Sequence, residues 1–224
     1  MTNVTEALGA RFSCRAFLDR PVERALIEEI IALAARAPSG GNLQPWHVDV
    51  LAGDALDALK AAVRDTLAAA PQGEPLPFAV YPSPLPEPWH RRRADNGEAL
   101  HASVGIARED RPARRAQFVR NYDFFGAPVG LFFSIGRLFD RPQWAHLGMF
   151  IANVMLLAEE RGLATCAQES WAAVHETVER FLAMPAERML YCGMALGHGD
   201  RAHPVNGWRT GRAPLSDFAT FRGF

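Results

Sequence analysis

The sequence predicts one mixed α+β domain, and three observations lead to that fold class. The chain has 224 residues, which is long for one small domain and short for two. Apolar side chains recur at helical spacing in some segments and alternate with polar ones in others, so helices and strands both occur along the chain. The G-x-G-x-x-G and G-x-x-x-x-G-K-[ST] motifs are both missing, which disfavours a Rossmann or P-loop fold.

The first third of the chain predicts helix, strand and helix. Residues 21–37 place apolar side chains on one helical face, and this helix must end before Pro38. Residues 46–52 alternate between apolar and polar side chains, which is typical of a strand. Residues 53–70 return to helical spacing, and Asp54 is the expected N-cap.

The middle of the chain is dominated by prolines. Residues 71–90 contain seven prolines, and no regular element is expected at that density, so we predict a long loop or lid. A helical pattern resumes over residues 111–125.

The remaining core elements are predicted from apolar runs bounded by turn residues. They are a buried strand at 127–136, a buried helix at 144–161 closed by Gly162, a short strand at 163–167, a helix at 173–184 and a buried strand at 188–197. The tail from residue 198 onward is polar and rich in turns, so we expect it to lie against another part of the protein.

Charge and cysteine usage exclude several classes of function. The net charge of −1 gives no overall field for nucleic acid or a membrane surface. Three cysteines, odd in number and far apart, lack metal-ligand spacing and indicate a reducing compartment. No signal peptide is visible, and the apolar run 146–158 is too short to span a bilayer. We therefore expect a cytoplasmic protein with no metal, nucleic acid or membrane partner.

Two groups of residues are candidates for chemistry. Arg11, Ser13 and Arg15 stand at alternate positions, so in extended backbone they point the same way and would suit a phosphate or carboxylate clamp. From the residues alone, a solvated surface pair of arginines stays open as the alternative. Arg209 and Arg212 form a second pair of closely spaced arginines, in the tail.

The stretch "APSGGNLQPWHV" (37–48) is the second unusual feature. It carries more conformationally special and hydrogen-bonding residues than a surface turn needs. A bend at the end of the preceding helix would need only Pro38 and one glycine, so the surplus calls for a further reason.

These motifs resemble the FMN-dependent nitroreductase family, in its nitrobenzoate-reductase-like branch. The resemblance rests on "RFSCRAF" followed by "APSGGNLQPWHV", and on the later blocks "WAHLGMFIANVMLLAEERGLATCAQESW" and "VNGWRTGRAPLSDF". It covers essentially the whole chain. It implies a single FMN-binding domain over residues 1–224 with a mixed central sheet flanked by helices, assembled as an intertwined homodimer. Residues 71–125 would be a variable insert or lid, and 198–224 a C-terminal extension.

The resemblance also implies roles for individual residues. Arg11 and Ser13 would hold the FMN phosphate, Arg15 would lie at the N1/C2 edge of the flavin, and the catalytic Glu169 would direct its backbone N–H at N5. The partner subunit would contribute Pro38, Ser39 and Asn42. The complete implied cofactor-binding set is Arg11, Phe12, Ser13, Arg15, Pro38, Ser39, Gly40, Asn42, Gln44, Ala167, Gln168, Glu169, Arg209 and Arg212.

The activity expected from this resemblance is an NADH- or NADPH-dependent reduction of nitroaromatics, quinones or similar small planar acceptors by a ping-pong mechanism. Two alternatives stay open. The same fold could carry other flavin chemistry, such as dehalogenation, dehydrogenation or flavin cleavage, or the chain could be a non-catalytic flavin-binding protein. The residues favour a solvated or intersubunit face for Arg91, Arg92 and Arg93 over a cofactor contact, and a buried packing role for Cys166 over a redox one.

Overall fold

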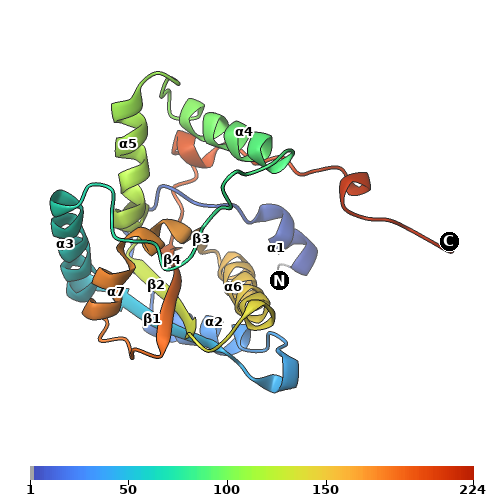
Figure 1. Cartoon of the computed structure of the whole chain (residues 1–224), viewed down its shortest axis with the longest axis horizontal. Coiled ribbons are helices and arrows are strands. Elements are labelled where there is room, and N and C mark those ends of the chain that lie inside the picture. The colour runs from blue at the N-terminus through green and yellow to red at the C-terminus, as the bar shows by residue number, and fades with distance from the viewer. Residues whose placement is uncertain (1–2) are drawn as a thin grey trace.

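The computed structural model describes residues 3–224, which are built around one four-stranded sheet (Figure 1). Its strands are β1 (Trp46–Ala52), β2 (Val129–Gly136), β3 (Ala164–Gln168) and β4 (Arg188–Gly197). Their order is β1-β2-β4-β3, and every neighbouring pair is antiparallel.

The expectation of a mixed sheet is therefore wrong for these four strands. Among the described residues, the parallel pairing is confined to one isolated bridge between Ser13 and Thr165, at the free edge of β3. The physical reason is that side-chain patterns identify strands but carry no information on their relative direction, which the connections decide.

Helices cover both faces of the sheet. One face carries α2 (Arg24–Ala34) and α6 (Arg141–Glu160), and the other carries α3 (Gly53–Ala69) and α7 (His175–Phe181). The remaining helices are α1 (Val4–Ala10), α4 (Trp89–Ala102) and α5 (Arg111–Val119). Figure 1 shows α4 and α5 side by side at one end of the molecule, where Glu98 and Arg114 form a two-bond ion pair between them.

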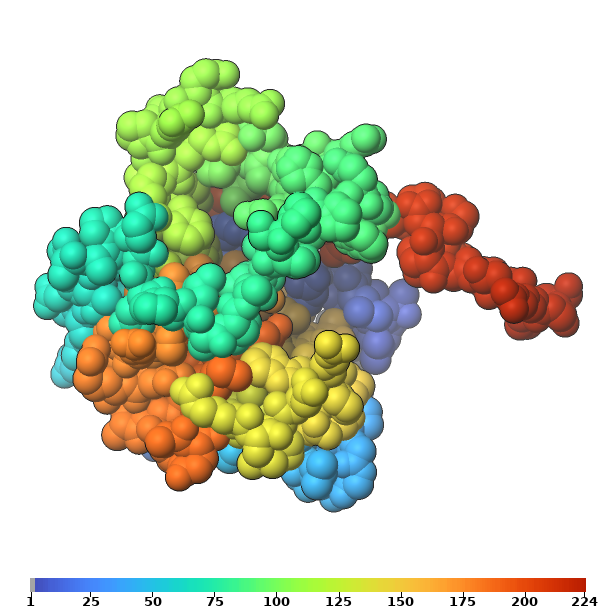
Figure 2. Space-filling view, viewed as in Figure 1, coloured from blue at the N-terminus to red at the C-terminus, as the bar shows by residue number. Residues whose placement is uncertain are grey.

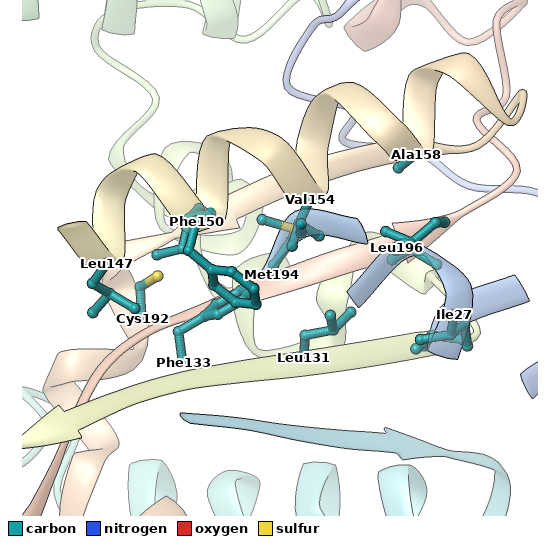
Figure 3. Packing of buried hydrophobic residues seen from close by; sticks show 14 of the residues in the cluster. Ile27, Leu131, Phe133, Leu147, Phe150, Val154, Ala158, Cys192, Met194 and Leu196 are labelled. Atoms are coloured by element: carbon teal, nitrogen blue, oxygen red, sulfur yellow. The ribbon is translucent and has the colours of Figure 1, made fainter. Parts of the chain in front are cut away.

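The first core layer lies between α6 and the sheet (Figure 3). Leu147, Phe150, Val154 and Ala158 recur at helical spacing, so they form one apolar face of α6. That face packs on alternate residues of β2 and β4, and α2 closes the layer from the side (Figure 3).

The second core layer depends on a close approach of Trp171 to the sheet. The Trp171 side chain is fully buried and packs edge-to-face against Phe132 at a centroid distance of 4.9 Å. This position is open only because residue 193 on β4 is glycine, since any Cβ there would overlap the indole ring. The packing fixes the 3-10 turn Glu169–Val174 directly after β3.

A β-bulge in β4 determines which way Tyr191 points. Cys192 pairs with Phe133 and Leu190 with Ser134, so Tyr191 is the extra residue between them. A bulge re-aims side chains relative to regular alternation. As a result Tyr191 and Cys192 both lie on the α6 side of the sheet, although they are adjacent in sequence.

Most predicted elements are confirmed, and three details differ. The strands over 46–52 and 188–197 have the predicted bounds, and residues 71–88 contain no helix or strand. However, the N-cap position of α3 is Ala52 rather than Asp54, α5 gives way to a 3-10 turn at Arg120, and α4 was not expected. Helix α4 buries no residue, so it has no apolar stripe to recognise.

Residues 3–224 lack a membrane-spanning helix and a cluster of metal ligands. No helix in this part of the chain is both long and apolar enough to cross a membrane. Nor do these residues contain a group of three or more His, Cys, Asp or Glu side chains positioned to hold a metal ion.

The Trp171 packing predicts that Gly193→Ala destabilises the fold. A Cβ at residue 193 would lie 2.6 Å from Trp171 Nε1, and overpacking of this kind costs about 1–3 kcal/mol. Gly97→Ala is the matched control, because nothing lies within 4 Å of its Cβ position and alanine favours the α4 helix by roughly 0.5–1 kcal/mol. Urea unfolding measures both variants, and equal stability of Gly193→Ala and the wild-type protein would contradict this packing.

Candidate functional site

The N-terminal segment runs beside β3 in extended form. The Cys14 N–H donates to the Thr165 carbonyl at 2.9 Å. Burial alternates along the segment: Phe12, Cys14 and Ala16 are buried, whereas the intervening residues are partly exposed. This confirms the prediction that Arg11, Ser13 and Arg15 share one face.

Asn206 joins the tail to this segment. Its side chain is only 3% exposed. Its Oδ1 accepts from the Arg15 N–H at 2.8 Å, and its Nδ2 donates to the carbonyls of Ala16 and Asp200 at 2.9 and 2.8 Å. These bonds bring the following residues of the tail to the exposed side of Arg11 and Arg15.

The junction encloses a cavity of about 350 Å³, which we call the basic cavity. It is lined by Leu8, Gly9, Arg11, Phe12, Ser13, Arg15, Asn96, Val205, Trp208, Arg209, Thr210 and Arg212. No Asp or Glu is among these residues, and none of the four arginines forms an ion pair within residues 3–224. The four positive charges therefore make this cavity suited to an anion from outside the chain.

Neutral partners hold several of these guanidinium groups. Arg209 Cζ lies 4.3 Å from the centroid of the Phe12 ring, and its Nη1 donates to the Asn206 carbonyl at 2.8 Å. Arg15 Nη1 donates to the Ser13 carbonyl at 3.2 Å. Arg212 Nη1 donates to Thr210 Oγ1 at 2.7 Å. These contacts position the donors without cancelling their charge.

A second cavity of about 590 Å³, the large cavity, lies where β3 ends. Its lining includes Ala167, Gln168 and Glu169, together with the aromatic side chains of Tyr81, Phe118 and Tyr191. A smaller cavity of about 270 Å³ shares Arg15 with the basic cavity, and it shares Phe118 and Asn121 with the large one. The smaller cavity therefore adjoins both of the others, and we call the three together the cleft.

The residues at the end of β3 have different orientations. Gln168 is buried, and its Nε2 donates to the Asn121 carbonyl at 2.7 Å while its Oε1 accepts from Trp171 Nε1 at 3.4 Å. Its side chain therefore braces the turn and leaves only its backbone for a ligand. Glu169 is exposed, and its Oε1 accepts from the Tyr191 hydroxyl at 3.4 Å.

Burial sets the protonation of two side chains near this turn. The pKa of Tyr191 is raised, mainly by burial and further by the proximity of Cys192 and Glu169, so its hydroxyl remains a hydrogen-bond donor. Burial likewise raises the pKa of Cys166 and keeps its thiol protonated. The packing role that we expected for Cys166 agrees with this environment.

The loop carrying Pro38, Ser39, Gly40, Asn42 and Gln44 lies apart from these cavities. None of its residues lines any of the three. Asn42 and Gln44 have φ values of 55° and 48°, in the left-handed region that few non-glycine residues adopt. The structure therefore brings together the predicted N-terminal, β3 and tail residues but leaves this loop exposed.

Three residues that the sequence did not single out take part in the cleft. Asn96 lines it from a polar helix and Tyr191 from a β-bulge, whereas Asn206 braces its N-terminal and tail segments from outside the cavities. None of these features leaves a local sequence pattern. Of the three adjacent arginines on α4, Arg92 pairs with Asp217 of the tail at 3.0 Å, and Arg93 Cζ lies 4.2 Å from the Tyr81 ring centroid.

Known proteins resemble this chain over nearly its full length. Residues 8–198 match the model of the Nitroreductase family. The chain is 35% identical to a nitrobenzene nitroreductase of Ectopseudomonas oleovorans, covering 97% of this chain and 96% of that one. It is 37% identical to a 4-nitrobenzoate reductase of Pseudomonas putida, with 97% and 94% covered. The crystal structure of the FMN- and NADPH-dependent nitroreductase NfnB from sphigopyxis sp. strain HMH superimposes with a TM-score of 0.97, at 46% identity and 99% and 100% coverage.

The contacts of Asn206 predict that Asn206→Ala releases the tail. Removing the amide leaves the Arg15 N–H unpaired, which costs roughly 1–3 kcal/mol, and it takes one of their donors from the carbonyls of Ala16 and Asp200. Hydrogen exchange should rise in residues 198–212 and in residues 11–17. The control is Asn153→Ala, which loses one hydrogen bond between α6 and Ala34 and should leave exchange in both segments unchanged. Unaltered exchange in Asn206→Ala would show that other contacts hold the tail.

Proposed function

This chain belongs to the nitroreductase family, and we propose that it is an FMN-dependent oxidoreductase that uses NADPH or NADH to reduce nitroaromatic compounds. The observation that carries the proposal is the basic cavity with its four unpaired arginines, open along one cleft to a large cavity with aromatic walls. FMN consists of a phosphate dianion, which suits the basic cavity, and a planar ring system, which suits the aromatic walls. The relatives named above include a nitrobenzene nitroreductase and an FMN- and NADPH-dependent nitroreductase.

The residues present fit FMN in charge and in donor type. Arg11, Arg209 and Arg212 supply guanidinium donors for the phosphate, and Ser13 adds a hydroxyl. Arg15 lies between the basic cavity and the next one along the cleft, where it would meet the edge of the ring system. The backbone N–H of Glu169 is the donor that we assign to flavin N5.

When bound, FMN would supply the redox chemistry of hydride transfer between nicotinamide and acceptor. The protein would position the cofactor and stabilise the charge that develops on it. Arg15 provides a fixed cation where negative charge develops. Gln168 holds the turn that presents the Glu169 N–H, through its bonds to Asn121 and Trp171. Apolar side chains of the large cavity exclude water and fit planar molecules.

We also propose that the active form is a homodimer in which the 38–44 loop of one subunit completes the cleft of the other. The exposed, left-handed backbone at Asn42 and Gln44 supports this role, because such conformations are concentrated at ligand sites. The tail offers a second argument. Figure 2 shows it projecting from the body, and its side chains Leu215, Phe218 and Phe221 are 55%, 71% and 66% exposed. A second subunit would cover these apolar groups.

The proposed activity is tested first by spectroscopy and then by kinetics. Purified protein supplied with FMN should be yellow, and anaerobic NADPH or NADH should bleach its flavin absorbance. Initial rates with varied NADPH and nitrobenzene should give parallel lines in double-reciprocal plots, because both molecules use the same site in turn. A protein that takes up no FMN, or whose bound flavin neither nucleotide reduces, contradicts the proposal.

The homodimer proposal predicts that Asn42→Gly weakens FMN binding without unfolding the chain. Glycine keeps the left-handed backbone and removes the side-chain amide, so the expected loss is about threefold to tenfold in affinity, equivalent to one hydrogen bond. Ala183→Gly is the control, since Ala183 also has a positive φ of 48° and lies outside the cleft. FMN titration measures both variants, and equal affinity for Asn42→Gly and the wild-type protein counts against the shared site.

A further inference from the structure

We propose that the large cavity selects uncharged nitroaromatic acceptors and discriminates against aromatic carboxylates. The proposal rests on the function proposed above and narrows its substrate class. Sequence similarity does not decide this point, because the chain is about equally similar to a nitrobenzene nitroreductase and to a 4-nitrobenzoate reductase. These two names differ in whether the acceptor carries a negative charge.

The lining of the large cavity contains one charged side chain, the carboxylate of Glu169. The other lining residues are Leu76, Val80, Tyr81, Phe118, Asn121, Gly148, Ile151, Ala167, Gln168, Ser170, Ala173, Tyr191 and Cys192. Lys, Arg and His are all missing from this set, so the wall offers an acceptor carboxylate no cation to pair with.

Several cations lie just outside the large cavity: His101, Arg114 and Arg115 line the smaller cavity that adjoins it, and two arginines contact the aromatic rings of its wall. Arg93 stacks on Tyr81, and Arg115 lies 5.7 Å from the Phe118 ring centroid while its Nη2 donates to the Pro71 carbonyl at 2.6 Å. Neither arginine lines the large cavity. Arg15 belongs to the neighbouring cavities, where the proposed function assigns it to the cofactor. The 38–44 loop proposed to come from the second subunit, "PSGGNLQ", adds no charged side chain.

The Glu169 carboxylate is tied to the cavity wall. The Tyr191 hydroxyl donates to its Oε1 at 3.4 Å, and Tyr191 itself lines the cavity and packs edge-to-face on Trp144 at a centroid distance of 5.3 Å. An aromatic carboxylate entering this space would lose hydration and meet a like charge, and both effects oppose binding. An ester or amide of the same shape would meet neither penalty. The hydroxyl group of Tyr81 is a neutral donor suited to the oxygens of a nitro group.

The first experiment compares methyl 4-nitrobenzoate with 4-nitrobenzoate on the FMN-loaded protein. We expect kcat/KM for the ester to exceed that for the acid by about tenfold or more, because the carboxylate of the acid would meet the like charge of Glu169 in the cavity. A parallel titration uses the unreactive analogues benzamide and benzoate, and follows the flavin spectrum of the oxidised protein. We expect benzamide to bind more tightly. Equal or tighter binding of benzoate, or equal or faster turnover of the acid, would overturn the proposal.

The second experiment identifies Glu169 as the source of the discrimination. Glu169→Gln keeps the backbone N–H and removes the charge, so the ester-to-acid ratio of kcat/KM should fall several-fold, by raising the rate with the acid. Glu187→Gln is the control, because Glu187 is exposed and outside the cleft, and it should leave the ratio unchanged. An unchanged ratio in Glu169→Gln would contradict the proposal.

Failure of the two proposals can be told apart. If neither nitro compound is turned over, the proposed function fails, and the benzamide and benzoate titration still decides the charge preference of the cavity. If both compounds are turned over and the acid is preferred, the proposed function stands and the inferred selectivity is wrong.

Discussion

Four guanidinium groups converge on one cavity without an acidic partner, and the rest of the site depends on how the fold keeps them there. Like charges repel, and neutral hydrogen bonds and one aromatic ring hold the side chains in place against that repulsion. Asn206 is central to this arrangement. It binds the N-terminal segment to a tail nearly two hundred residues away, and it satisfies buried backbone groups of both.

The sheet and its second core layer position the other end of the cleft. Gly193 leaves room for Trp171, and Trp171 in turn contacts Gln168 and fixes the turn that begins at Glu169. The bulge in β4 adds Tyr191 to the same wall. Packing deep in the protein therefore determines the direction of a backbone N–H and the place of one carboxylate at the surface.

Local patterns predicted the parts of this structure that depend on neighbouring residues. The period-two alternation of residues 46–52 identified a strand, and the alternate positions of Arg11, Ser13 and Arg15 predicted one shared face if that segment is extended, as it is. Strand direction, the bulge at Tyr191 and the role of Asn206 arise from long-range contacts, so no local spacing encodes them. The resemblance to a known family identified the Arg11–Arg15 clamp, whereas Asn96 on the polar helix α4 required the structure.

The most direct test of this account is the affinity of the protein for FMN compared with riboflavin, which lacks the phosphate. If the unpaired arginines form a phosphate site, FMN should bind about a hundredfold or more tightly than riboflavin. Arg11→Ala should reduce that ratio by about tenfold or more, while Arg24→Ala, in an exposed helical ion pair, should leave it unchanged. Equal affinities for FMN and riboflavin in the wild-type protein would contradict the account.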